Sequence, residues 1–289
     1  MYIRRGILNM GIIEAAVYGL IQGIAEFLPI SSSGHLALAQ NLFGTENIDS
    51  DTYLAFNVLL HLATLLAVCI VYRNDILKLI KGFFTLAAKL FTGRIKQGLD
   101  FGEKLFVMLV VATLPLVPAA LLGADESVGF ISSVSWVIGV LLIINGAVLW
   151  ISDRLSRGAV ILEGSRIPKA LIPGLTQVIG LLPGISRSGI TITGGLLAGF
   201  KREDAVRLSF LMSIPAILGS CVLELPEFFA SGLPAGAAPA FLTGAAVAAV
   251  SGFFAIKLLQ YLAKNRGFAV FSVYCITIGA AAIIADAII

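Results

Sequence analysis

A segment of twenty residues occurs twice in this chain, and both copies lie within apolar sequence. Residues 15–34 match residues 170–189 at nine of twenty positions, among them Gln22 with Gln177 and Ser31 with Ser186. Duplicated units of this kind build many membrane transporter folds. We therefore expect two related halves, each of which begins with one copy of the segment.

The composition is typical of a polytopic membrane protein. Of the 289 residues, 58% are hydrophobic and only 13% are charged, and the mean hydropathy is +0.98. Soluble domains carry about twice this charged fraction, and the apolar runs approach the roughly 20 residues that cross a bilayer as a helix. A net charge of +3 gives no indication that nucleic acid is a partner. Three cysteines in apolar runs, Cys69, Cys221 and Cys275, show no metal or redox spacing.

The positions of lysine and arginine predict the orientation in the membrane. Basic residues gather in segments 73–104 and 154–169, which indicates that these segments are cytoplasmic. Acidic segments without lysine or arginine are expected outside, and they are 44–53, 123–130 and 224–238. Arg4 and Arg5 are exceptions, because the same scheme places them outside.

Six membrane spans and two re-entrant hairpins fit this charge distribution. The hairpins are expected at 11–43 and 168–200, since each segment begins and ends on one side if the chain doubles back at its proline and glycine residues. The spans are expected at 54–72, 104–122, 131–151, 205–224, 238–263 and 268–288. The basic amphipathic stretch 78–91 is expected to connect two spans, and a helix in the inner lipid interface is the alternative.

The predicted fold is therefore one all-α polytopic membrane domain over residues 1–289. Its six transmembrane helices and two re-entrant helical hairpins form an inverted-topology repeat, with the first repeat at about 11–151 and the second at about 168–289.

The first hairpin carries polar and ionisable side chains that are costly at membrane depth and therefore indicate a functional site. Gln22 and Glu26 are four residues apart, so they share one helix face and can converge on one metal ion or one water. Hydroxyls and an imidazole follow at the predicted tip, on Ser31, Ser32, Ser33 and His35. Hydroxyls and backbone N–H groups at such a tip suit phosphate oxygens, and histidine suits general acid catalysis or nucleophilic attack.

The second hairpin places Arg187 where the first has Ser32. Hydroxyls surround this arginine, on Ser186, Ser188 and Thr191. Arginine binds phosphate in a bidentate manner. The two tips together predict an anion pocket, and its place within a membrane protein favours a lipid phosphate or diphosphate as the ligand.

Structural interpretations of the same residues stay open. Glu26 can form a salt bridge with Arg187 that only locks the hairpins together, and the serines can be helix caps. His61 lies in a predicted span whose sequence has no polar neighbours of this kind, and we expect it to be a packed, hydrogen-bonding residue.

These residues resemble a known family. Two segments carry the resemblance: Gln22-x-x-x-Glu26-Phe-Leu-Pro-Ile-Ser-Ser-Ser-Gly-His35 and Pro183-Gly-Ile-Ser-Arg-Ser-Gly-Ile-Thr191. They are similar to the two signature motifs of the undecaprenyl-diphosphate phosphatase family (UppP, also called BacA). The resemblance implies hydrolysis of undecaprenyl diphosphate to the lipid carrier of cell-wall peptidoglycan synthesis, and a link to bacitracin resistance. It also implies a multi-pass protein of the bacterial inner membrane whose active site faces outward.

The resemblance matches Gln22 and Glu26, the serines with His35, and the segment around Arg187 to the family's motifs, and we prefer the following mechanism for them. Arg187, the serines and the tip amides would hold the diphosphate, Glu26 would act as base or metal ligand, and Ser32 or His35 would attack the terminal phosphorus. Our preferred nucleophile is Ser32, assisted by Glu26 or His35. Many members carry Glu where this chain has Gln22, so a divalent cation, Mg²⁺ or Ca²⁺, held by Gln22 and Glu26 would lose one anionic ligand.

Other functions stay open at this point. An inverted repeat favours a flippase for polyprenyl phosphate or a small-anion transporter on architecture alone, and fold does not decide function. A purely structural membrane module would leave the buried Glu, His and Arg unexplained. The sequence does not determine the oligomeric state, and a homodimer is one option.

Overall fold

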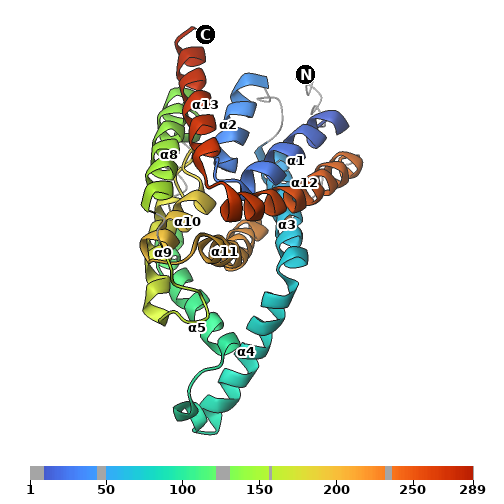
Figure 1. Cartoon of the computed structure of the whole chain (residues 1–289). Helices are drawn as coiled ribbons and strands as arrows, with labels where there is room; N and C mark the ends of the chain where they lie inside the picture. The colour runs from blue at the N-terminus through green and yellow to red at the C-terminus, as the bar shows by residue number, and fades with distance from the viewer. Residues whose placement is uncertain (1–9, 44–49, 122–130, 156–157, 232–235, 289) are drawn as a thin grey trace.

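The computed structural model describes residues 10–43, 50–121, 131–155, 158–231 and 236–288, and these residues are almost entirely helical (Figure 1). The first half contains α1 (Ile12–Phe27), α2 (Ser32–Phe43), α3 (Ser50–Val71), α4 (Arg73–Phe91), η2 (Arg94–Gln97), α5 (Phe101–Thr113), α6 (Leu116–Leu121) and α8 (Ser135–Leu155). The second half contains η3 (Ile167–Ala170), α9 (Leu171–Ile179), α10 (Arg187–Leu197), α11 (Arg202–Ser231), α12 (Ala238–Asn265) and α13 (Ala269–Ile288). Within the described ranges the extended backbone pairing is a single bridge between Val160 and Phe200.

Six segments of the described residues are long and apolar enough to cross a membrane, which confirms the predicted all-α multi-pass class. They are Thr52–Val71, Phe101–Ala119, Ser135–Arg154, Arg202–Glu224, Ala238–Asn265 and Ala269–Ile288. Each overlaps one predicted span. The predicted span 104–122 is broken, however, because Pro115 offers no backbone N–H and separates α5 from α6.

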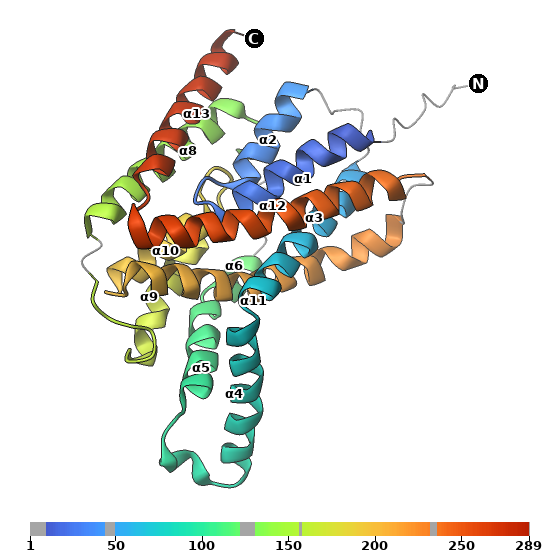
Figure 2. The same ribbon diagram turned by 45° about the vertical axis from the view of Figure 1, so that its right-hand side comes forward.

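Several expectations about orientation fall outside the described residues. Most of two predicted outer segments lies outside them, at residues 44–49 and 122–130. The same holds for Arg4 and Arg5. The opposite entry of the two hairpins into the membrane stays a prediction. The predicted connecting helix 78–91 is part of α4, which packs along α5 in a pair that extends away from the other helices (Figures 1 and 2).

The two repeated segments fold as helical hairpins, α1–α2 and α9–α10. Helix α1 ends at Phe27 because Leu28, the residue before Pro29, adopts an extended ψ of 144°. Ser31 then turns the chain with a φ of 73°, a left-handed conformation that is uncommon for a residue with a side chain. In the second hairpin the corresponding turn uses Gly184, whose φ is 99°. Both turns bring polar tip residues toward the middle of the molecule.

Each hairpin packs against the middle span of the other half through an equivalent glycine. A Cβ atom on Gly19 of α1 would lie 2.3 Å from the carbonyl oxygen of Gly244 in α12, and one on Gly174 of α9 would lie 2.5 Å from that of Ala112 in α5. These positions correspond in the sequence repeat. The contacts are therefore compatible with two interlocked halves related by the predicted repeat.

The Gly19 contact predicts a steric cost for any side chain there. We expect Gly19→Ala to lower stability by about 1–3 kcal/mol, as overpacking of a close helix contact does, measured by thermal unfolding of the purified protein in detergent. Gly219→Ala in α11 is the matched control, since a Cβ there has no heavy atom within 4 Å. An equal melting temperature for Gly19→Ala and wild type would contradict the packing described here.

Candidate active site

The two hairpin tips, together with α3, α6 and α11, line a cavity of about 320 Å³. Most of the polar lining comes from motif residues: Glu26, Ser31, Ser32, Ser33, Ser186 and Arg187. His61, Ser220 and Glu224 add further polar groups, while the apolar lining includes Leu116, Leu181, Ile185, Ala216 and Ile217. Cavities of this size hold a small polar group rather than a long lipid chain.

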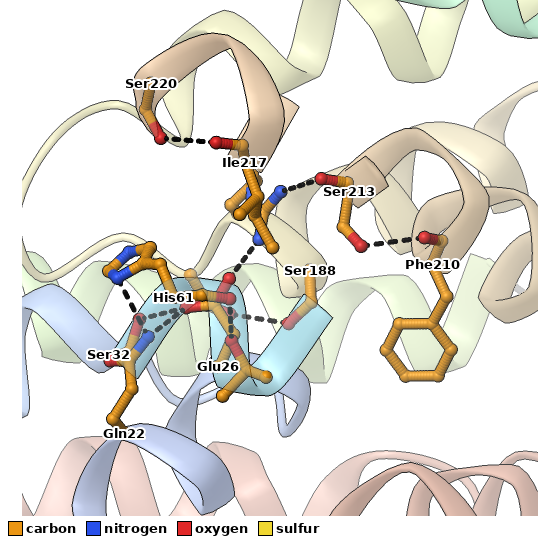
Figure 3. A network of polar contacts seen from close by, with 12 residues as sticks. Gln22, Glu26, Ser32, His61, Ser188, Phe210, Ser213, Ile217 and Ser220 are labelled. Carbon is orange, nitrogen blue, oxygen red and sulfur yellow. Dashed lines mark hydrogen bonds and ion pairs between the residues drawn. The ribbon is translucent and has the colours of Figure 1, made fainter. Parts of the chain in front are cut away.

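Glu26 is the centre of the polar network (Figure 3). This carboxylate is 7% exposed; its Oε1 pairs with Arg187 across the two hairpins. Its Oε2 accepts hydrogen bonds from Ser32 Oγ at 2.8 Å and from Gln22 Nε2 at 3.1 Å. The salt bridge between hairpins is thus present, and a hydroxyl is bonded to the same carboxylate. A serine hydroxyl beside a buried base is the arrangement of an activated nucleophile.

The strained Ser31 turn is held by hydrogen bonds from both hairpins. Ser31 Oγ accepts from the backbone N–H of Gly34 at 3.3 Å and from that of Gly184 at 3.1 Å. The Ser31 carbonyl accepts from His35 Nδ1 at 2.8 Å. Strained backbone of this kind persists where surrounding contacts over-determine it. The turn presents Ser32 to Glu26.

His35 does not line the cavity. Its Nδ1 must carry the proton, because the Ser31 carbonyl can only accept, and its Nε2 therefore accepts from the hydroxyl of Tyr274 at 2.9 Å. The two rings are stacked with centroids 5.5 Å apart. The structure brings Glu26, Ser32 and Arg187 together and leaves His35 as a support of the tip.

The other predicted phosphate ligands divide into two groups. Ser31, Ser33 and Ser186 line the cavity, although Ser186 Oγ also caps α10 by accepting from Gly189 N at 3.1 Å. Ser188 and Thr191 lie behind the tip. Thr191 Oγ1 is 2.6 Å from Ser209 Oγ on α11, so it joins two helices rather than facing the cavity.

Asn145 of α8 joins the two tips, which the sequence did not indicate. Its Nδ2 donates to the Pro29 carbonyl at 2.9 Å, and its Oδ1 accepts from the Ser186 N–H at 3.0 Å. All three groups are buried. One amide therefore fixes the distance between the hairpins.

We expect Asn145→Leu to lower stability by about 1–3 kcal/mol, because it leaves a buried N–H and a buried carbonyl without these partners. Activity should fall as well, since the tips lose their connection. Thermal unfolding in detergent measures the first effect. Asn41→Leu, at an exposed amide that contacts Ser135, is the control and should change stability by less than about 0.5 kcal/mol. Similar stability of the two variants would contradict this role.

His61 was missed as a site residue. It lines the cavity, and its Nδ1 lies 3.2 Å from Gln22 Nε2. The expectation of a packed, hydrogen-bonding residue included such bonds but not a place in the cavity lining. The only available signal was its place within the apolar sequence of α3, which does not distinguish a packed histidine from a functional one.

The donor set does not fit a resident divalent cation. Glu26 is the carboxylate at the tips, and both of its oxygens are already bonded. The Gln22 side chain contacts it through nitrogen, which is not a metal ligand in an amide, and Gln22 does not line the cavity. Among the described residues no group of three His, Cys, Asp or Glu side chains forms a metal-binding cluster.

Comparison with known proteins finds similarity along nearly the whole chain. The family model described as bacitracin resistance protein BacA matches residues 15–281. A protein of Methanobrevibacter smithii named undecaprenyl-diphosphatase is 36% identical over 272 residues, which are 93% of this chain and 96% of that protein. Proteins of the same name from Alkaliphilus metalliredigens and Moorella thermoacetica are 37% and 39% identical, over 94% of this chain and 97% and 96% of their own lengths.

Proposed function

The chain belongs to the bacitracin resistance protein BacA family, and we propose that it hydrolyses undecaprenyl diphosphate to undecaprenyl phosphate and inorganic phosphate. This reaction supplies the lipid carrier used in cell-wall synthesis. The observation that carries the proposal is the hydrogen bond from Ser32 to Glu26 beside Arg187, inside a cavity large enough for a phosphate head group.

The geometry supports a two-step reaction through a phosphoserine. Ser32 Oγ attacks the terminal phosphorus while its proton passes to Glu26, and the bond from that phosphorus to the bridging oxygen breaks. Undecaprenyl phosphate leaves with the electron pair of that bond and takes up the proton held by Glu26. Water then attacks the phosphoserine while one of its protons passes to Glu26, and the bond from phosphorus to Ser32 Oγ breaks. Glu26 returns this proton to Ser32 Oγ as inorganic phosphate is released, so both residues regain their starting states.

Arg187 and the tip serines stabilise the transferring group. Phosphoryl transfer depends mainly on positioning and on electrostatic stabilisation, and the guanidinium lies beside the carboxylate that activates Ser32. The cavity volume is too small for a long isoprenoid tail, so the tail stays in the bilayer while the head group enters.

Release of inorganic phosphate tests the proposal directly. Purified protein in detergent should release phosphate from undecaprenyl diphosphate, and a flippase or anion carrier should bind the lipid without releasing phosphate. The assay should be run with and without chelator, since the residues at the tips do not themselves fit a bound metal. Failure of the wild-type protein to release phosphate would overturn the assignment.

The protein is a multi-pass membrane protein, and we place the cavity toward the outer face of the cell membrane. Basic residues mark the beginning of α11, at Arg202 and Arg207, whereas the cavity is lined by the later part of the helix, from Ala216 to Glu224. By the positive-inside rule the beginning of α11 is cytoplasmic.

Cysteine labelling tests this orientation. After replacement of the three native cysteines, Ala238→Cys at the start of α12 should react with an impermeant thiol reagent added to intact cells. Gln97→Cys in η2 should react only after the cells are opened. Both positions are exposed on the protein, so accessibility depends on the side of the membrane. The reverse pattern would contradict the proposed orientation.

A further inference from the structure

A fully buried amide joins Glu26 to His61. Gln22 has 0% exposure, and its Nε2 lies 3.1 Å from Glu26 Oε2 and 3.2 Å from His61 Nδ1. Figure 3 shows these three side chains close together next to Ser32. The amide is thus in contact with the base of the proposed reaction and with a histidine that lines the same cavity.

The chemistry of these groups fixes the orientation of the Gln22 amide. An ionised carboxylate only accepts hydrogen bonds, so the NH₂ group and not the amide oxygen must face Glu26. The NH₂ group has two hydrogens. One is donated to Glu26, and the second has His61 Nδ1 as its acceptor among the described residues.

The protonation of His61 follows from this orientation. His61 Nδ1 also lies 3.1 Å from the Asn57 carbonyl, to which it could donate only if it carried a proton. In that case the second hydrogen of Gln22 would be buried without an acceptor. The Asn57 carbonyl, by contrast, lies four residues before His61 within α3 and accepts the helical bond from its backbone N–H. Since an unpaired buried donor costs more than an unused carbonyl lone pair, Nδ1 accepts from Gln22 and the proton resides on Nε2.

We propose that the Nε2–H group of His61 donates a hydrogen bond to the terminal phosphoryl group in the cavity, and that Gln22 is the positioning residue that fixes this tautomer. The inference rests on the proposed function for the identity of the ligand. Since Nδ1 is bonded to Gln22, Nε2 is the ring nitrogen that remains for a ligand, and His61 lines the cavity with Glu26, Ser32 and Arg187. A donor fixed in advance stabilises the charge of the transferring phosphoryl group without reorganisation.

Nitrogen NMR of labelled histidine tests the tautomer without any turnover. The chain has two histidines, and His35 serves as an internal reference because its Nδ1 must be protonated by its bond to Ser31. In the neutral rings we expect opposite tautomers, with Nε2 protonated on His61. Gln22→Glu should move the His61 proton to Nδ1, since a carboxylate can only accept. A protonated Nδ1 on His61 of the wild-type protein would overturn the inference.

Contact with phosphate is tested by adding inorganic pyrophosphate to the same sample. In the wild-type protein the Nε2 nitrogen resonance of His61 should shift when pyrophosphate saturates the site. In the Gln22→Glu variant the same resonance of His61 should not shift, because Nε2 there carries no proton. No shift in wild type at saturation would overturn the proposed contact. This readout does not depend on hydrolysis, so it separates failure of the inference from failure of the phosphatase assignment.

Two substitutions test the contribution to catalysis. In His61→Gln the amide nitrogen reaches the former position of Nε2 and can donate, whereas in His61→Asn it reaches only the position of Nδ1. We expect kcat/KM within about threefold of wild type for His61→Gln, and roughly tenfold to hundredfold lower for His61→Asn, as for one lost bond to a charged group. If kcat/KM fell equally in both variants while their melting temperatures were equal, His61 would have a purely structural role and the proposal would be overturned.

Discussion

Ser32→Ala is expected to lower turnover of undecaprenyl diphosphate by at least about a thousandfold, the scale seen when a covalent nucleophile is removed. The change removes the hydroxyl that lies 2.8 Å from Glu26 and leaves the carboxylate paired with Arg187. Acid quenching of wild type during turnover should trap an acid-stable, base-labile phosphoenzyme that is absent from the variant. Mass spectrometry locates the modified residue.

Ser152→Ala is the matched control for this experiment. The Ser152 hydroxyl is also buried, but it donates to the Leu149 carbonyl in its own helix and lies outside the cavity. It should behave as wild type. Substantial turnover by Ser32→Ala would favour direct attack by water activated at Glu26, and an acid-labile adduct would point to phosphohistidine.

Glu26→Gln is expected to slow hydrolysis by at least about a hundredfold, the lower end of general acid–base contributions. The amide keeps the shape of the side chain and cannot accept the Ser32 proton. Binding of lipid diphosphate should persist, since Arg187 and the tip hydroxyls are unchanged. Phosphate release measures the first effect, and displacement of a labelled lipid diphosphate measures the second.

The control for Glu26→Gln is the same substitution at Glu103. This carboxylate is also buried and ion-paired, with Lys89 Nζ at 2.7 Å, but it lies in α5 outside the cavity. Glu103→Gln should reduce stability and leave turnover per folded molecule near wild type. Near-normal hydrolysis by Glu26→Gln would show that the carboxylate is not the base.

Local sequence predicted much of the fold and the centre of the site. Apolar length predicted the six long helices, and the proline before the serines predicted the first hairpin turn. The motif spacing also predicted that Glu26, Ser32 and Arg187 meet, because polar groups in apolar hairpins need one another as partners. The break at Pro115 was a local signal that hydropathy alone did not reveal.

The orientation of single side chains could not be predicted. His35 follows the serines in the motif, yet its bond to the carbonyl four residues earlier turns it toward Tyr274. His61 and Asn145 lie in long apolar helices with no motif around them. Their roles depend on contacts between helices that are distant in the sequence, at separations of 39 residues for Gln22 with His61 and 116 residues for Asn145 with Pro29, which no local pattern encodes.

The contact of Gly19 with Gly244 has a consequence for biosynthesis. Because α1 packs on α12, the first hairpin is translated more than two hundred residues before its packing partner emerges from the ribosome. Glu26 is likewise synthesised before its ion-pair partner, Arg187. Until then a polar hairpin must be kept from lipid, where its unpaired carboxylate is costly. We therefore expect that the two halves do not assemble one after the other, and that the first hairpin is shielded from lipid until Arg187 and α12 have been synthesised.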